Sequence, residues 1–188
     1  MKPGLLLLSG GAGTRMGGPK HGLDHPAGGS WGGHLVRVFE GVFPGAPLQV
    51  LGEALPDRPD LPRLQDPREG PAVALRVWAA VEVPPVDVWW VVACDQVRWT
   101  VARLRDWSAA CEAADPAHTR WVLALSEGHL QPLGGWLPQA LRPVLAASPA
   151  RSLMALATAL PHLALPCTGG EWVDVDTPEE RSRFEREG

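Results

Sequence analysis

The chain has 188 residues, of which 45% are hydrophobic, and a formal net charge of −4. We expect one domain over residues 1–188, and this apolar content excludes a disordered chain. The acidic balance argues against a nucleic-acid partner, and no apolar run is long enough to span a membrane. Three widely spaced cysteines, and an apolar run near the N-terminus of only four leucines, predict a cytoplasmic protein without a secretory signal.

Hydrophobic spacing, glycines and prolines predict alternating strands and helices. The expected strands are Leu5–Leu8, Leu48–Leu51, Val86–Ala93 and Trp121–Leu125, and the expected helices run from near Ser30 through Phe39, then over Val73–Val81, Val101–Ala113, Leu137–Ala147, Ser152–Ala159 and Pro178–Arg186, with a loop at Pro56–Pro67. This alternation is typical of a three-layer, Rossmann-like α/β fold with a mostly parallel sheet. Ligands of such sheets bind beyond the carboxyl ends of the strands, so the loop after Leu8 and the segment after Ala93 should share one edge.

The loop Ser9–Lys20 contains the most informative pattern of the chain. Its glycines, at positions 10, 11, 13, 17 and 18, permit positive φ and bring backbone N–H groups close to a ligand, while Arg15 and Lys20 add positive charge. These are the properties of a site for nucleotide phosphates, although a glycine-rich turn with two solvated cations would have the same residues. A Walker A motif fails because Pro19 precedes the lysine and His21 follows it. A dinucleotide fingerprint fails because Gly11–Gly17 is one residue too long.

Three acidic segments lie where such a site needs carboxylates. Asp95 directly follows the strand ending at Ala93, where it either binds Mg²⁺ or caps the next helix. Asp174 and Asp176 share a face of an extended segment; Asp176 either joins Asp95 on the metal or supports the helix that Thr177 caps. Asp66 either contacts the nucleoside or makes an Asx turn before Pro67.

The loop pattern, carried by Leu8, Gly10, Gly11, Arg15, Met16, Gly17 and Lys20, resembles the signature of the sugar-nucleotide and cofactor nucleotidyltransferases. Asp66 with Gly70-Pro71, Cys94-Asp95, Gln131-Pro132-Leu133 and Val173–Glu180, in this order, are similar to the molybdenum cofactor guanylyltransferases of the MobA type. The resemblance spans nearly the whole chain. It implies a Mg²⁺-dependent enzyme that transfers GMP from GTP to the phosphate of molybdopterin and releases pyrophosphate.

The resemblance also implies roles for single residues. Leu8, Ser9, Gly10 and Gly11 would line the nucleotide site, Asp66 would contact the nucleoside, and Lys20 would hold phosphate. Asp95 would bind GTP and Mg²⁺, with Asp176 as a second metal ligand, and Arg15 would lie near the β- and γ-phosphates. Arg15, Lys20 and Asp95 would therefore carry catalysis, and the product would bring transient contact with molybdoenzymes or cofactor-delivery proteins.

Some positions depart from that family. Gly52-Glu53 stands where an asparagine is common, no proline follows Asp95 closely, and Asp174 and Asp176 replace frequent asparagines. Two other functions therefore remain open. One is a cytidylyltransferase or a sugar-phosphate nucleotidyltransferase with the same mechanism, and the other is a nucleotide-binding protein without catalysis. We assign no role to His21, His25 or His34, and we expect the nine tryptophans to fill the core.

Overall fold

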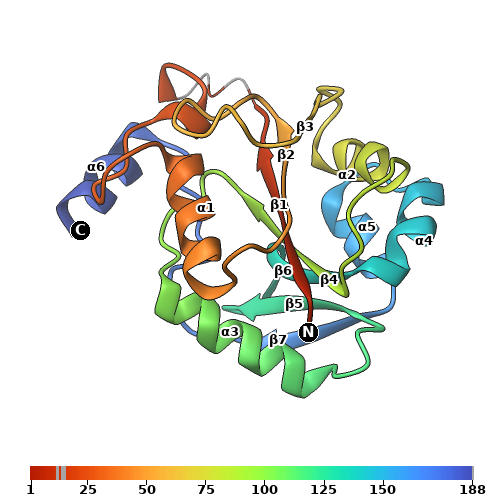
Figure 1. Ribbon diagram of the computed structural model, residues 1–188. Coiled ribbons are helices and arrows are strands. Elements are labelled where there is room, and N and C mark those ends of the chain that lie inside the picture. Colours follow the sequence, from red (N-terminus) through yellow and green to blue (C-terminus); the bar gives the residue numbers. More distant parts are fainter. Residues whose placement is uncertain (12, 14–15, 188) are drawn as a thin grey trace.

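A seven-stranded mixed sheet forms the centre of the computed structural model, which describes residues 1–11, 13 and 16–187 (Figure 1). The strands are β1 Pro3–Ser9, β2 Leu48–Gly52, β3 Arg63–Leu64, β4 Val88–Ala93, β5 Trp121–Ser126, β6 His129–Pro138 and β7 His162–Pro166, in the order β3-β2-β1-β4-β6-β5-β7. β6 runs antiparallel to both of its neighbours, β4 and β5, and the other pairs are parallel. The predicted mostly parallel sheet is confirmed.

Helices cover both faces of the sheet and complete the predicted three layers. They are α1 Trp31–Val42, α2 Pro71–Ala79, α3 Val101–Ala114, α4 Arg142–Ala147, α5 Leu153–Ala159 and α6 Pro178–Glu187, with short 3₁₀ turns η2 Lys20–Gly22 and η3 Gln139–Leu141. α1 and α3 lie on one face, whereas α2, α4 and α5 lie on the other (Figure 1). The central strand β1 shows why two covered faces are needed, because Leu5 and Leu7 pack on one side and Leu6 and Leu8 on the other.

Large aromatic side chains fill much of the core. All nine tryptophans are buried, as expected. On the α3 side, the ring of Trp99 contacts both Trp90 and Trp172 edge to face, and Trp172 in turn contacts Trp107, with ring centroids 5.0–5.2 Å apart. Such pairs add about 0.5–1.5 kcal/mol each to the area they bury. This aromatic cluster fixes the start of α3 against the segment that leads to α6.

Two expectations about secondary structure are wrong, and two further strands were not predicted. Pro56–Pro67 is not all loop, because Arg63–Leu64 pairs with β2 as the edge strand β3. Leu137–Ala147 is not one helix: Leu137 belongs to β6 and the helix α4 begins at Arg142. The strands β6 and β7 were not expected, since β6 contains prolines and paired glycines that disfavour a strand. Gly135 is needed there, because a Cβ atom would lie 2.6 Å from the carbonyl oxygen of Val122 on β5.

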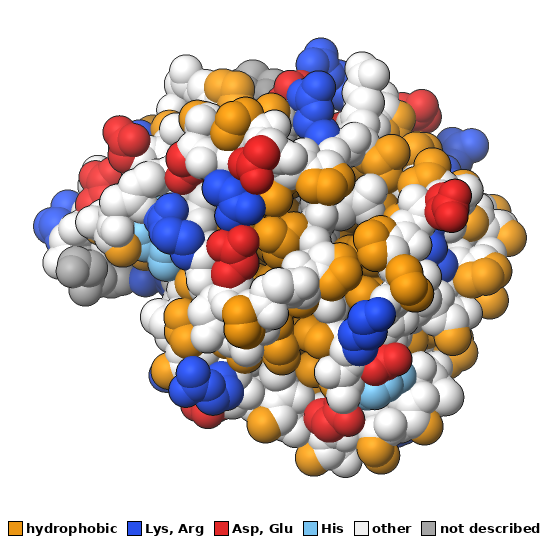
Figure 2. Space-filling model, in the orientation of Figure 1, with side chains coloured by type: hydrophobic (Ala, Val, Ile, Leu, Met, Phe, Trp, Pro, Cys, Tyr) orange, Lys and Arg blue, Asp and Glu red, His pale blue; other side chains and the backbone are white. Residues whose placement is uncertain are grey.

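The surface carries no dominant charge on the face seen in Figure 2, where cationic and anionic side chains are interspersed. Hydrophobic side chains gather over α2, α4 and α5 in the same view. Each of these helices has an exposed apolar residue, namely Val77, Val144 and Met154. Among the described residues, no helix is both long and apolar enough to cross a membrane.

Candidate functional site

Lys20, Asp95 and Asp176 meet at the carboxyl edge of the sheet, beyond the ends of β1 and β4. The ammonium of Lys20 donates to Asp95 Oδ2 over 2.9 Å and to Asp176 Oδ1. The side chains of Lys20 and Asp95 are only 16% and 19% exposed, whereas that of Asp176 is 48% exposed. Three segments far apart in the sequence therefore form one charged cluster. The expectation that the glycine-rich loop and the segment after Ala93 share an edge is confirmed.

The carboxylate of Asp95 is not the cap of the following helix, which was the alternative to a metal role. Thr100 takes that position, and its Oγ1 accepts from the backbone N–H of Arg103. Asp95 Oδ1 is buried and has no hydrogen-bond partner. A buried carboxylate oxygen without a partner carries a desolvation cost of about 1–3 kcal/mol or more, and a bound cation would remove it. Asp95 Oδ1 is thus an unused acceptor that can coordinate a cation in addition to the ammonium of Lys20.

The acidic segment before α6 is held against Asp95 by backbone contacts. Val175 N–H donates to the carbonyl oxygen of Asp95 over 3.1 Å. Thr177 caps α6 as expected: its Oγ1 accepts from Glu180 N–H, while Glu180 Oε2 accepts from the N–H groups of Thr177 and Asp176. This capping box leaves the Asp176 side chain to face Lys20 rather than the helix N-terminus.

Charges within this cluster perturb one another. Although Asp174 keeps contact with solvent, partial burial raises the pKa of its carboxyl to about 7, and the neighbouring carboxylates of Asp95 and Asp176 act in the same direction. Burial lowers the pKa of Lys20, but its hydrogen bond to Asp176 and the charge of Asp95 outweigh burial, so this pKa is raised. The edge therefore concentrates more negative charge than one lysine neutralises, which favours cations there.

A preformed metal cage is not present among the described residues, which include no group of three or more His, Cys, Asp or Glu side chains placed to hold an ion. Lys20 instead lies between Asp95 and Asp176, where its ammonium takes the position of a cation. The donor set is two carboxylates with one free oxygen on Asp95, and such oxygen ligands suit Mg²⁺ or Mn²⁺ when phosphates complete the shell. The carboxylates of Asp95 and Asp176 are suitable ligands for such a cation, and their metal role stays a prediction.

Asp66 and Gly10 lie together at the β2 side of the cluster. A Cβ atom at position 10 would collide with Asp66 Oδ2, so only glycine lets the carboxylate pack against this backbone. Asp66 Oδ1 accepts from Arg68 N–H over 2.8 Å, which is the Asx turn considered as its structural alternative. The turn uses one oxygen and leaves the other beside Gly10. The turn thus does not exclude the predicted nucleoside contact.

Leu8 and Ser9, the last two residues of β1, are buried and anchor the β1 end of the site in the core. Leu8 is buried on the α2 face, and Ser9 is fully buried with its Oγ donating to the carbonyl oxygen of Glu53 over 2.7 Å. Gly52, at one of the two positions where the resembling family commonly has an asparagine, has φ +130°. A Cβ atom there would lie 2.5 Å from Gly10 N and 2.9 Å from Ser9 Oγ. Close approach of β2 to the glycine-rich loop therefore requires glycine at position 52.

The glycine-rich loop itself has the predicted conformation at several positions. Gly11, Gly13 and Gly17 have φ of +108°, +56° and +77°. Nothing lies within 4 Å of a Cβ placed on Gly11, so its backbone faces open space. Arg15 lies outside the described residues. The N–H groups of Met16 and Gly18 both donate to the carbonyl oxygen of Gly13, so the described part of the loop closes on itself in a conformation that glycine permits.

Three histidines to which the sequence assigned no role lie near the site. His21 is buried, and this burial lowers its pKa. His25 and His34 stack at 3.6 Å between ring centroids and bond the carbonyl oxygens of Val97 and Trp99, respectively. His25 and His34 thus hold the segment 97–99, which follows Asp95, against the start of α1. No motif predicts them, because the partners of His25 and His34 are backbone groups more than sixty residues away.

Comparison with known proteins places the chain in a family. The family model described as "MobA-like NTP transferase domain" matches residues 5–163. A comparison with curated protein sequences finds no significant match. Similar solved structures include Rv0371c from Mycobacterium tuberculosis H37Rv (21% identity, 99% of each chain covered, TM-score 0.72) and molybdopterin-guanine dinucleotide biosynthesis protein A from Archaeoglobus fulgidus (14%, 97% of each chain, TM-score 0.73).

Two further structures widen the comparison. One is 2-C-methyl-D-erythritol 4-phosphate cytidylyltransferase from Thermus thermophilus (12% identity, 96% of each chain, TM-score 0.67). The other is Rv0371c in complex with manganese (16% identity, 99% of this chain and 98% of that one, TM-score 0.65). At these low identities the TM-scores show a shared fold, and the family model covers most of the sequence. The chain belongs to the MobA-like NTP transferase domain family of nucleotidyltransferases.

Proposed function

We propose that this protein transfers GMP from GTP to the terminal phosphate of molybdopterin and releases pyrophosphate. The observation that carries the proposal is the cluster of Lys20, Asp95 and Asp176 beside the glycine-rich loop. Family membership supports nucleotidyl transfer, and the resemblance of the motifs to MobA-type enzymes supports the choice of guanine nucleotide and acceptor.

The reaction needs no protein nucleophile. An oxygen of the acceptor phosphate attacks the α-phosphorus of GTP in line, the bond to the β-phosphate oxygen breaks, and pyrophosphate leaves with the electron pair. Lys20 and Arg15 stabilise the charge that develops on pyrophosphate. Leu8, Ser9, Gly10, Gly11 and Asp66 hold the nucleotide. Catalysis then consists of alignment and neutralisation of charge.

Asp95 and Asp176 would hold a divalent cation, for which we propose Mg²⁺. When bound, this cation would supply positive charge that offsets the negative charge of the phosphates. The manganese complex of Rv0371c, a structural neighbour, is consistent with a divalent metal in this fold. On the protein, the orphaned Asp95 Oδ1 supports the same assignment.

Product analysis tests the proposal. The purified protein is incubated with Mg²⁺, molybdopterin and each nucleoside triphosphate in turn, and the products are identified by mass spectrometry. We expect the guanine dinucleotide from GTP, with none from the other three. Asp60→Asn, an exposed aspartate that pairs with Arg58, is the matched control for Asp95→Asn and should retain full product. Formation of a cytosine dinucleotide would instead identify the protein as a cytidylyltransferase. If a nucleotide binds but no product forms, the result would favour another acceptor or a protein without catalysis.

A further inference from the structure

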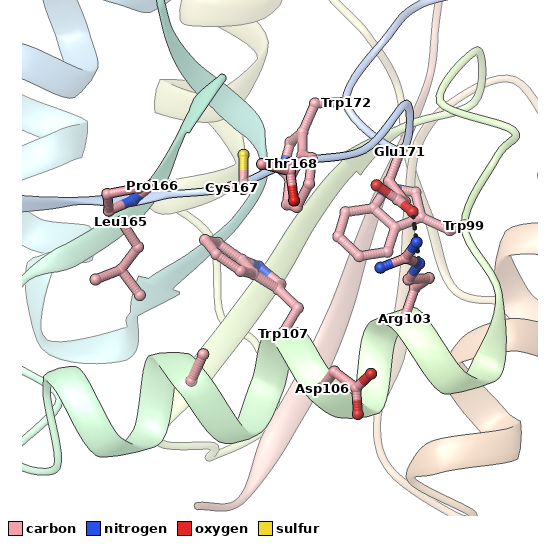
Figure 3. Close-up of a pocket in the computed structure, with 11 residues that line it drawn as sticks. Trp99, Arg103, Asp106, Trp107, Leu165, Pro166, Cys167, Thr168, Glu171 and Trp172 are labelled. Atoms are coloured by element: carbon pink, nitrogen blue, oxygen red, sulfur yellow. Dashed lines mark ion pairs between the residues drawn. The ribbon is translucent and has the colours of Figure 1, made fainter. Parts of the chain in front are cut away.

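A second concave site lies on the opposite side of Asp95 from Gly10 and Asp66. It is a pocket of about 320 Å³ between α3, the end of β7 and the loop 167–172 (Figure 3). Trp107 and Trp172 form aromatic walls, Leu165 and Pro166 close the far end, and Arg103 and Glu171 face each other near Trp99 (Figure 3). The volume is at the lower end of the range of small-molecule sites and suits a flat ligand of two or three rings.

One polar group in this pocket lacks a partner. The side chain of Glu171 is only 9% exposed; its Oε1 pairs with Arg103 Nε at 3.0 Å, but Oε2 is buried without a hydrogen bond. The indole N–H groups of Trp99 and Trp172 are also buried without an acceptor. Orphaned groups of this kind are rare in native structures because each costs free energy. Arg103 is 58% exposed, so the ion pair lies at the mouth and can open toward a ligand.

Backbone contacts connect this pocket to the catalytic edge. Gln96, the residue after Asp95, donates from Nε2 to the carbonyl oxygen of Trp172 over 3.4 Å. Val175 N–H bonds the carbonyl of Asp95 itself. The three residues from Trp172 to Val175 span at most about 11 Å. The pocket is therefore within the length of one extended ligand from the carboxylates.

The strand order places the predicted nucleotide-binding residues and the pocket at opposite ends of the carboxyl edge of the sheet. Gly10 and Asp66 follow β1 and β3, Asp95 follows β4 in the middle, and Cys167 and Thr168 follow β7 at the other margin. A nucleotide held by Gly10 and Lys20 thus leaves the β7 side free. If the acceptor approaches the α-phosphate from the β7 side, the end of the acceptor that lies farthest from the α-phosphate is at the tryptophan-lined pocket.

We infer that this pocket binds the heterocyclic end of the acceptor, and that its preferred ligand is a flat, nitrogen-rich ring with adjacent N–H donors, such as the aminopyrimidinone edge of a pterin. Glu171 accepts these N–H groups, since a carboxylate is an acceptor only, and Trp107 and Trp172 contact the ring. Acceptor selectivity then depends on Glu171 and the tryptophans. This inference rests on the proposed function for the identity of the acceptor.

Binding of a free pterin tests the inference without any turnover. The probe is 6-hydroxymethylpterin, whose own fluorescence anisotropy reports binding to the whole protein. We expect binding by the unaltered protein, at least a tenfold weaker affinity for Glu171→Gln, and no binding for Ala110→Phe, which places a ring in the pocket from the exposed face of α3. Ala109→Phe, on the same helix but outside the pocket, and Glu82→Gln, a glutamate remote from the pocket, are the matched controls and should bind normally.

The readouts separate this inference from the proposed function. GTP-induced thermal stabilisation should be equal in all four variants, which also shows that each is folded. Equal pterin affinity in Ala110→Phe and Ala109→Phe would overturn the inference, as would absence of pterin binding by the unaltered protein. Pterin binding that requires Glu171, in a protein that transfers no GMP to molybdopterin, would support the pocket and contradict only the proposed reaction.

Discussion

Asp95→Asn is the substitution with the most direct consequence. It replaces a carboxylate by a neutral amide of almost the same size, next to Lys20 and with one oxygen that has no partner. Two unit charges 2.9 Å apart attract by about 6 kcal/mol at an effective dielectric constant of about 20, and desolvation of the partly buried pair offsets much of this. Loss of the Asp95 charge also relieves repulsion from Asp174 and Asp176. We therefore expect the free energy of unfolding to change by only about 1 kcal/mol.

The effect on turnover should be far larger. Removal of one preorganised charge-stabilising group typically costs about 10²- to 10³-fold in kcat, or about 3–4 kcal/mol in the transition state. The assay is the rate of pyrophosphate release with saturating GTP, Mg²⁺ and acceptor, and urea unfolding monitors the fold. The pKa of Asp174, followed by NMR, should fall in the same variant, because Asp95 is one of the charges that raise it. Turnover within threefold of the unaltered protein would refute the role given to Asp95.

Three further substitutions probe other parts of the account. Lys20→Met removes the ammonium that lies between Asp95 and Asp176, so turnover should fall. Calorimetry without nucleotide should then show that Mn²⁺ binds about tenfold more tightly. Unchanged Mn²⁺ affinity would contradict the idea that Lys20 and the metal ion occupy the same position. Burial lowers the pKa of His34 from about 6.5 in the unfolded chain to about 4 in the folded protein. Between these two pH values the unfolded state binds more protons than the folded state. The free energy of unfolding therefore falls as the pH drops through this range, by about 3 kcal/mol in all. Urea unfolding at pH 7 and pH 4 should show this loss, and His34→Gln should reduce it, while the part that comes from His21 and His25, whose pKa values burial also lowers, remains. Gly52→Ala forces a side chain into a positive-φ position against Gly10 N, so thermal unfolding should show a loss of about 1–3 kcal/mol and titration should show weaker GTP binding.

The parts of the fold that could be predicted are those with an unambiguous local signal. The runs Leu5–Leu8 and Val88–Ala93 are apolar on both faces, and only a central strand between two helical layers requires that. Thr177 with Glu180 predicts a helix start from two residues alone. In contrast, β6 contains Gly134 and Gly135, which are explained by contacts with Trp172 and Val122 that no local pattern contains.

The same division holds for the candidate site. The rule for parallel sheets brings Lys20 and Asp95 to one edge, and the acidic segment before α6 was expected to join them. The sequence does not reveal that Lys20 lies between two carboxylates, because this arrangement depends on Val175 N–H holding the segment to Asp95. The tryptophan-lined pocket could not be predicted either, since its walls come from α3 and from a loop more than fifty residues further on. Its residues belong to no motif.

Pyrophosphate release reports the proposed transfer of GMP to molybdopterin at each turnover. Initial rates are recorded with Mg²⁺ and each of the four nucleoside triphosphates, with and without molybdopterin. The account predicts release with GTP alone, only when molybdopterin is present, and loss of this rate in Asp95→Asn but not in Asp60→Asn. Release that is independent of molybdopterin, or equally fast in Asp95→Asn, would contradict it.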